Sequence, residues 1–211
     1  MHKIVVASTN PGKLKELKAM LDLNIRWASL SDFPDMPEVI EDGQTFAENA
    51  RKKAIGYAKA TGLWTIADDS GLVVDALGGE PGVHSARFSG EKTKADNNDM
   101  LDHRNMAKVL RLLDTIPKEK GTARFVCSLC LASSENVLIE VKGTVEGIIT
   151  EKEIGKNGFG YDPIFFIPEL DKTAAELTAE EKNAISHRGN AIRKLKPLLK
   201  ELLESQNPAC K

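Results

Sequence analysis

Two long segments in which apolar and polar residues alternate constrain the fold of this chain more than any other feature. Residues 122–132 and residues 137–149 each show this alternation, through Phe125, Cys127, Leu129 and Leu131 in the first and Val137, Ile139, Val141 and Val145 in the second. A period of two is the pattern of a β-strand with one buried face. The residues between the segments, 133–136, are Ser-Ser-Glu-Asn, and such residues favour turns. The sequence therefore predicts a β-hairpin.

The rest of the chain alternates between shorter strands and helices. Strands are predicted at residues 3–7, 24–30 and 164–167, and helices at residues 11–21, 45–60, 96–114, 178–184 and 190–203, the last kinked or restarted at Pro197. Residues 78–90 are rich in glycine and are predicted to be a loop. No linker or repeat divides the chain, so we expect one domain over residues 1–205 and a short tail at residues 206–211.

Residues 67–71, Ala-Asp-Asp-Ser-Gly, carry a strong chemical signal. Because Asp, Ser and Gly favour turns, we predict that a strand ends here and that the chain turns. Successive strand residues face opposite ways, so Asp68 and Asp69 are expected to do different work. One would bind a divalent cation or activate a water molecule, and the other would brace the turn. An ordinary surface turn is the alternative.

Two further stretches suit a phosphorylated, planar ligand. Residues 8–13 join a predicted strand to a helix N-terminus, where free amides and the helix dipole favour a phosphate. They lack the P-loop pattern, so an ordinary strand-to-helix turn fits equally well. Residues 155–163 combine glycines, which let backbone approach a ligand, with aromatic side chains that stack on planar rings.

The composition narrows the class of protein. A net charge of −2 and 5% aromatic residues argue against a nucleic-acid-binding protein. No apolar run approaches the ~18 residues of a membrane span, and no secretory signal is visible, so we expect a cytoplasmic protein. Cys127 and Cys130 fall on opposite faces of a predicted strand, which favours a structural role over a zinc site or a disulfide.

Six stretches, taken together, are typical of one enzyme family. They are Ser8-Thr9-Asn10-Pro11-Gly12-Lys13, Glu41-x-Gly43-x-Thr45-Phe46-x-Glu48-Asn49-Ala50, Ala67-Asp68-Asp69-Ser70-Gly71-Leu72, Pro81-Gly82-x-x-Ser85-Ala86-Arg87, Gly158-Phe159-Gly160-Tyr161-Asp162-Pro163 and Ser186-His187-Arg188-Gly189. In these stretches the chain resembles the inosine triphosphate pyrophosphatase family, from residue 4 to about residue 200. Residues 91–105 are longer than the resemblance leads us to expect, and we expect them to touch no site motif.

The resemblance implies a fold and an activity. The implied fold is α/β, with an elongated mixed β-sheet and flanking helices that form two lobes around a central active-site cleft. The implied enzyme depends on Mg²⁺ and hydrolyses ITP, dITP or XTP to the nucleoside monophosphate and pyrophosphate. It is expected to act as a homodimer, with no nucleic-acid or membrane partner, and to remove these nucleotides before they enter DNA or RNA.

The resemblance also implies a role for each matching residue. Asp69 is the expected catalytic residue, which orients or deprotonates the attacking water, and Glu41 and Asp69 are the expected Mg²⁺ ligands. The expected phosphate-binding residues are Ser8, Thr9, Asn10, Pro11, Gly12, Lys13 and Lys53. Ser70 is expected to touch the substrate, and the nucleoside is expected to bind to Phe159, Gly160, Tyr161, Asp162 and Lys182, with His187 and Arg188 reading the base.

Three rival functions remain open at this point. A nucleotide sensor without turnover would keep the lysines and the base loop but has little use for Glu41 and Asp69 around a metal. A single-stranded nucleic-acid binder would need a basic, aromatic groove. A phosphomonoesterase would use similar residues but release inorganic phosphate instead of pyrophosphate.

Overall fold

The computed structural model describes residues 2–8, 11–90, 97–117 and 121–206. Its main elements are β1 (His2–Val6), α1 (Pro11–Leu21), β2 (Ile25–Ser29), α2 (Phe46–Thr61), β3 (Trp64–Val74), α3 (Asn98–Leu113), β4 (Thr122–Ala132), β5 (Val137–Ile149), β6 (Phe165–Ile167), β7 (Lys172–Thr173), α4 (Ala179–Ile185) and α5 (His187–Ser205). The strands form a seven-stranded sheet in the order β2-β1-β3-β4-β5-β6-β7. Strand β1 is parallel to β2 and β3, whereas β6 is antiparallel to β5 and β7. The expected α/β fold with a mixed sheet is confirmed.

The chain divides into two compact units. Unit 1 contains residues 1–69, 127–143 and 188–211, and unit 2 contains residues 70–126 and 144–187. The long strands β3, β4 and β5 each contribute residues to both units. The candidate site residues are therefore distributed over both units.

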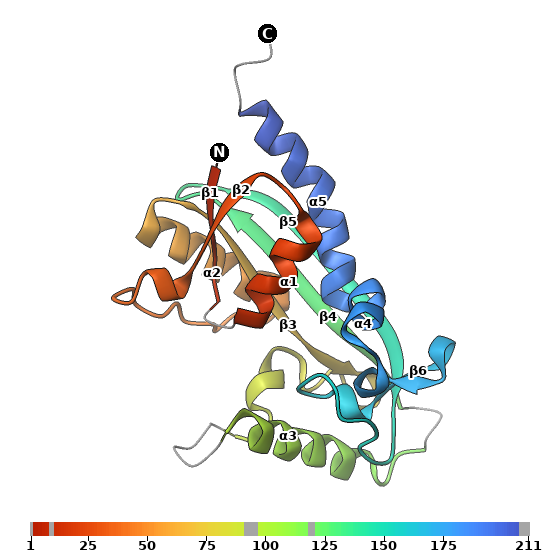
Figure 1. Ribbon diagram of the computed structural model, residues 1–211. Helices are drawn as coiled ribbons and strands as arrows, with labels where there is room; N and C mark the ends of the chain where they lie inside the picture. Colours follow the sequence, from red (N-terminus) through yellow and green to blue (C-terminus); the bar gives the residue numbers. More distant parts are fainter. Residues whose placement is uncertain (1, 9–10, 91–96, 118–120, 207–211) are drawn as a thin grey trace. The chain divides into compact units, whose positions relative to one another are not determined.

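In unit 1, helices cover both faces of the sheet (Figure 1). Helices α1 and α5 pack on one face in a buried cluster that includes Leu17, Leu21, Ile192, Leu195, Ile4, Val6, Ile66, Cys127 and Leu129. Helix α2 packs on the other face through small side chains, in a cluster that includes Ala50, Ala54, Ala67, Cys130 and Ala132. Cys127 and Cys130 thus belong to opposite faces, as predicted, and both side chains are buried.

Unit 2 has a core of its own, built around α3 and the unit's share of β3, β4 and β6. Apolar residues from these elements and from residues 161–177 bury one another in a single cluster, which includes Leu72, Val74, Met106, Val109, Phe125, Tyr161, Ile164, Phe165 and Leu177. The rings of Phe125 and Phe165 pack with their centroids 4.4 Å apart. Because Tyr161 packs in one cluster with Met106 and Val109 of α3, this core anchors the residue 155–163 stretch in unit 2.

The predicted turn at residues 67–71 is wrong, because β3 continues through these residues to Val74. A side chain at Gly71 would overlap that of Ser85, and its Cβ would lie 2.8 Å from the carbonyl oxygen of Gly82. The Ser85 hydroxyl accepts a hydrogen bond from the Leu72 amide at 2.9 Å and donates one to Gly82 at 2.6 Å. Gly71 therefore permits a close approach to β3 and does not serve a turn.

Gly71→Ala is expected to destabilise the protein by ~1–3 kcal/mol, because overpacking a fitted contact forces backbone to move. At this chain length each kcal/mol lowers Tm by ~2–4 °C, which calorimetry resolves. In a Ser85→Gly background two of the three close contacts at the new Cβ are gone, so the same substitution should cost less there. An equal cost in both backgrounds would contradict the role of the Ser85 contact.

Local signals predicted most helix ends correctly. Thr45 at the start of α2 and Thr178 at the start of α4 each accept the amide three residues further on, at 3.2 Å. Gly62 ends α2 with a φ of 69°. Two local features differ from expectation. Residues 82–87 form a 3-10 helix instead of a loop, and α5 begins at His187 instead of residue 190 and does not restart at Pro197.

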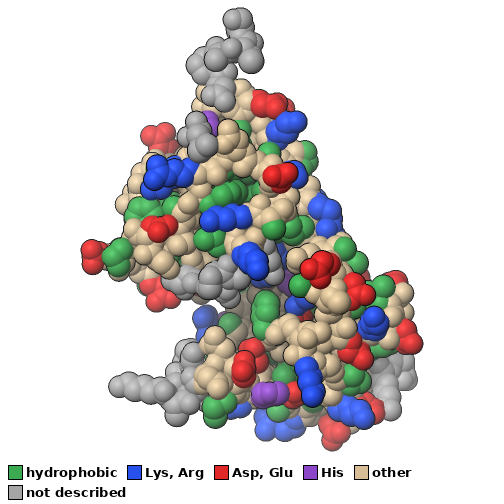
Figure 2. All heavy atoms as spheres, in the orientation of Figure 1, with side chains coloured by type: hydrophobic (Ala, Val, Ile, Leu, Met, Phe, Trp, Pro, Cys, Tyr) green, Lys and Arg blue, Asp and Glu red, His purple; other side chains and the backbone are tan. Residues whose placement is uncertain are grey.

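The surface carries charges of both signs. On the face shown in Figure 2, acidic and basic side chains are interspersed over the described part of the chain. Among the helices of the described residues, none has the length and the apolar character that a membrane span requires.

Candidate active site

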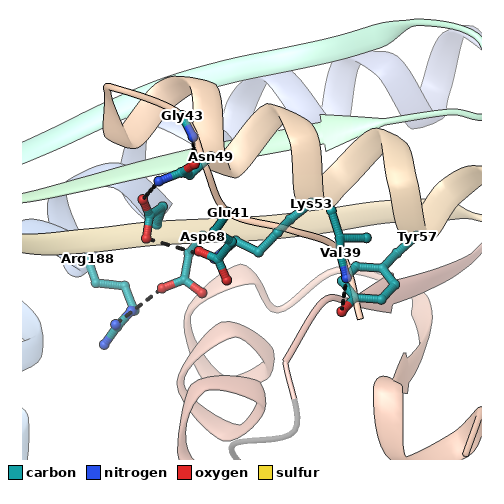
Figure 3. Close-up of polar contacts among 9 residues, drawn as sticks. Val39, Glu41, Gly43, Asn49, Lys53, Tyr57, Asp68 and Arg188 are labelled. Carbon is teal, nitrogen blue, oxygen red and sulfur yellow. Dashed lines mark hydrogen bonds and ion pairs between the residues drawn. The ribbon is translucent and has the colours of Figure 1, made fainter. Parts of the chain in front are cut away.

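The two adjacent carboxylates of β3 point to different partners, as the strand geometry predicted. Asp68 is 6% exposed and lies 3.3 Å from the Nη2 atom of Arg188, which is itself 7% exposed. Asp69 instead accepts a hydrogen bond on its Oδ2 atom from the side-chain amide of Asn49, at 3.1 Å. Both pairs lie within unit 1. Figure 3 shows Arg188 pointing toward Asp68.

The ammonium group of Lys53 lies between the two carboxylates that were expected to bind a metal. Its Nζ atom is 2.8 Å from Glu41 Oε2 and 3.8 Å from Asp69 Oδ1. Lys53 is 9% exposed and comes from α2, whereas Glu41 precedes that helix and Asp69 belongs to β3. Three residues from separate parts of the sequence thus converge within unit 1.

Two side chains of α2 hold this arrangement in place, and neither was singled out from the sequence (Figure 3). Asn49 accepts a hydrogen bond from the Gly43 amide at 2.7 Å while its amide group donates to Asp69. The hydroxyl of Tyr57 accepts the Val39 amide at 3.3 Å. The segment that carries Glu41 is therefore fixed to α2 on both sides. Asn49 lies one helical turn before Lys53, and this shared polar face was the available signal.

Burial controls the electrostatics of this cluster. Loss of hydration raises the pKa of Asp69 to about 6, although Lys53 and the Asn49 amide favour its charged form. For Lys53, burial alone would lower the pKa, but the Asp69 and Glu41 carboxylates outweigh burial and the pKa is raised. A carboxylate whose pKa approaches neutral pH has the basicity required to accept a proton from water.

The donor set of this cluster fits a magnesium ion. Glu41 and Asp69 present carboxylate oxygens toward one common cation, the Lys53 ammonium group. Among the described residues, no group of three or more His, Cys, Asp or Glu side chains is placed to enclose a metal. Mg²⁺ does not need such a cage, because it keeps several waters and is commonly held by one or two carboxylates together with substrate phosphates.

In unit 2, residues 158–162 form a compact loop around the Asp162 carboxylate. Asp162 Oδ2 accepts the amide of Phe159 at 2.8 Å and also contacts the Lys182 ammonium group. Gly158 adopts a φ of 80°, and a side chain there would collide with Asp162. The Phe159 residue is 57% exposed, and Lys182 Nζ lies 4.7 Å from the centre of its ring. The loop therefore presents an exposed aromatic ring next to a cation, as a site that stacks on a purine requires.

His187 belongs to the same unit and lies close to this loop. Its ring stacks on Phe125 with the centroids 4.9 Å apart. Asp162, Lys182 and His187 line one small cavity of about 10 Å³, which has room for about one water molecule. The structure thus brings together His187 and the residues expected to hold the nucleoside. The adjacent Arg188 contacts Asp68 in unit 1. The two residues expected to read the base, His187 and Arg188, therefore belong to different units.

The remaining predicted site residues are described only in part. Ser70 lies half-buried in β3, and Ser8 follows β1. Helix α1 begins at residue 11, as the proline there predicted. The structure does not describe Thr9 and Asn10, and it describes only the backbone of Pro11, Gly12 and Lys13. Phosphate binding by residues 8–13 therefore stays a prediction.

Comparison with known proteins gives a consistent result. The model of the Ham1 family matches residues 4–198. The chain is 50% identical over 204 residues to a dITP/XTP pyrophosphatase of Geobacillus kaustophilus, and the match covers 96% of this chain and 97% of the relative. It is 51% identical over 197 residues to a dITP/XTP pyrophosphatase of Geobacter sulfurreducens, and that match covers 93% of this chain and 96% of the relative. A solved HAM1 protein from Coxiella burnetii is 42% identical and covers 95% of this chain and 100% of its own, with a TM-score of 0.87. These matches span nearly the whole sequence and confirm the resemblance, so this chain belongs to the Ham1 family.

Proposed function

We propose that this chain hydrolyses the non-standard purine nucleotides ITP, dITP and XTP to the nucleoside monophosphate and pyrophosphate. The observation that carries the proposal is the convergence of Glu41 and Asp69 on the Lys53 ammonium group. The identity of about 50% to dITP/XTP pyrophosphatases over nearly the whole chain supports it. Hydrolysis of these nucleotides removes them before they are incorporated into DNA or RNA.

We infer that Glu41 and Asp69 hold a Mg²⁺ ion. Such an ion, when bound, would polarise phosphate oxygens and neutralise charge as pyrophosphate leaves. Lys53 adds a fixed positive charge in the same place. Asn49 holds the Asp69 carboxylate in orientation, and Asp69 accepts the proton of the attacking water as the water oxygen bonds to phosphorus and the bond to pyrophosphate breaks.

The nucleoside contacts are assigned from the described loop and its neighbours. The purine ring stacks on the exposed face of Phe159, beside the Lys182 ammonium group. Gly160, Tyr161 and Asp162 shape the loop that carries this ring, and Ser70 contacts the substrate from β3. His187 and Arg188 read the base, and residues 8–13 bind the phosphates together with Lys53.

An assay of product identity tests the proposal. The protein is incubated with a panel of nucleoside triphosphates and Mg²⁺, and pyrophosphate and inorganic phosphate are measured separately. We expect pyrophosphate from ITP, dITP and XTP, and loss of turnover when a chelator removes the metal. Release of inorganic phosphate alone would indicate a phosphomonoesterase, and binding without any product would indicate a sensor.

Lys13→Ala is expected to raise KM for ITP by ~10–100-fold, because a hydrogen bond to a charged group contributes ~1.5–3 kcal/mol. Binding of the monophosphate product should weaken much less, since Lys13 is assigned to the β- and γ-phosphates. The matched control is Lys15→Ala, an exposed lysine on the same helix. Steady-state kinetics and product inhibition measure both quantities. Equal losses for ITP and for the monophosphate would contradict this assignment.

Further properties are proposed from the family resemblance alone. These are a homodimeric state, a cytoplasmic location, a single catalytic domain over residues 1–205 with a tail at residues 206–211, and an active-site cleft between two lobes. Light scattering of the purified protein tests the first of them, and a monomeric mass at micromolar concentration would contradict it.

A further inference from the structure

Helix α3 contacts residues 158–162, which we call the substrate loop. The first turns of this helix lie within residues 91–105, which were expected to touch no site motif. The amide of Gly160 donates a hydrogen bond to Asp102 Oδ2 at 2.7 Å. Gly160 has a φ of 64°, a left-handed conformation that glycine adopts without strain. The expectation for residues 91–105 is therefore wrong, because the fold brings Asp102 to a loop 58 residues further along the chain.

The neighbours of Gly160 show what this contact adds to the loop. The amide of Phe159 is held from within the loop by Asp162, and the Tyr161 hydroxyl donates to the carbonyl oxygen of Ser85 at 2.8 Å. Gly160 lies between these two residues, and its amide is held by Asp102, which belongs to helix α3. The residue next to the exposed Phe159 is therefore fixed by a side chain from outside the loop.

The same face of α3 fixes a second segment of unit 2. Asn105, one turn after Asp102, is 2% exposed and accepts the amide of Ser89 at 2.7 Å. Its amide group donates to the carbonyl oxygens of Ser85 and Ala86 at 3.4 and 3.3 Å. Since Ser85 also accepts from Tyr161, α3 holds the substrate loop through Asp102 directly and through Asn105 indirectly.

The surroundings of Asp102 disfavour a charged carboxylate unless a specific partner stabilises it. Burial raises its pKa, the Gly160 amide favours the charged form, and the Asp99 and Asp162 carboxylates oppose it. Retaining a half-buried carboxylate beside other acidic groups costs free energy, and the Gly160 hydrogen bond, with a smaller contribution from His103, offsets this cost.

We propose that Asp102 is a positioning residue for nucleoside binding: its carboxylate holds the Gly160 amide and thereby orients the Phe159 ring on which the purine stacks. The inference rests on the proposed function, because it assigns a role within the same substrate site. Asp102 acts through backbone and does not touch the substrate, so its loss affects binding more than the chemical step.

Steady-state kinetics with ITP separate this role from a structural one. Asp102→Ala is expected to raise KM about tenfold and to change kcat less than about twofold. Asp102→Asn keeps an acceptor oxygen and should restore KM to within about twofold of wild type. The matched control is Asp99→Ala, which removes an exposed carboxylate one turn earlier on α3 and should leave KM unchanged. An unchanged KM in Asp102→Ala would overturn the proposal, as would a fall in kcat and Tm alone.

Amide hydrogen exchange tests the contact without any substrate. Mass spectrometry of a peptide covering residues 158–162 should show faster exchange in Asp102→Ala than in wild type or Asp99→Ala, and slow exchange again in Asp102→Asn. Equal exchange in all four proteins would overturn the proposal. If the wild-type protein fails to cleave ITP, the proposed function is wrong, and the exchange result still decides whether Asp102 holds the loop.

Discussion

Asp69→Asn is expected to lower kcat for ITP hydrolysis at least ~10²-fold, the low end for removal of a positioned general base. Asparagine keeps the shape of the side chain, so the hydrogen bond from Asn49 to position 69 can persist. It cannot accept a proton from water, and it removes the negative charge that faces Lys53 and that Mg²⁺ requires. Pyrophosphate release at saturating ITP and Mg²⁺ measures the effect.

The folded state should tolerate this change. Burial raises the pKa of Asp69 to about 6, above its value in an unfolded chain. A carboxyl group whose pKa is higher in the folded than in the unfolded chain destabilises the folded state at any pH above the unfolded-chain pKa. A neutral asparagine at this position should therefore not lower Tm at pH 7. Asp68→Asn gives the contrast in stability, because it leaves the buried Arg188 without its carboxylate partner and should lower Tm, whereas Asp69→Asn should not. Near-normal turnover of Asp69→Asn would move the catalytic role to Asp68 or Glu41.

The fold could be predicted from the sequence wherever local patterns decide the structure. The alternation in β4 and β5 and the capping residues Thr45 and Thr178 specify their elements without help from distant parts of the chain. Residues 67–71 are different, because their local preference for a turn competes with a distant contact. Ser85 fits against Gly71 and pairs with Leu72, and this tertiary contact keeps the strand extended.

The candidate site divides in the same way. The resemblance named Glu41 and Asp69 as metal ligands and Lys53 as a phosphate-binding residue, and the structure places all three side chains close together in unit 1, whereas their roles stay predictions. Asn49 stands in a family motif and on one helix face with Lys53, but its role in holding Asp69 was not recognised, because Asp69 lies 20 residues away. Asp102 was not recognised, because its partner Gly160 lies 58 residues away and no short spacing in the sequence links the two. A side-chain amide and a carboxylate on helices also have ordinary surface roles, so residue type alone gives no signal.

Arg188→Ala is expected to abolish most ITP and XTP activity and to narrow the preference over ATP. Hypoxanthine and xanthine present an oxygen at position 6, which accepts hydrogen bonds, whereas adenine presents an amino group. Arg188 offers only donors, and His187 can donate from one ring nitrogen or both, so facing adenine would leave buried groups unpaired at ~1–3 kcal/mol each. Two such mismatches amount to ~10²-fold or more against ATP. GTP shares the 6-oxygen, so the preference for ITP over GTP should persist.

The contact between Arg188 and Asp68 complicates this experiment, because removing one partner of a buried ion pair costs ~3–5 kcal/mol. A low activity of Arg188→Ala could then reflect unfolding. The double variant Asp68→Asn/Arg188→Ala also removes the buried carboxylate charge and should recover much of the lost Tm.

The ratio of kcat/KM for ITP to that for ATP separates base reading from stability. If Arg188 reads the 6-oxygen, this ratio falls in both variants that lack the arginine and stays near wild type in Asp68→Asn alone. A ratio that falls equally in Asp68→Asn would show that Arg188 depends on Asp68 for its orientation. If Arg188→Ala keeps its ITP-to-ATP ratio and loses only its ITP-to-GTP ratio, the 6-oxygen assignment is wrong, and discrimination at this residue concerns the 2-position of the purine.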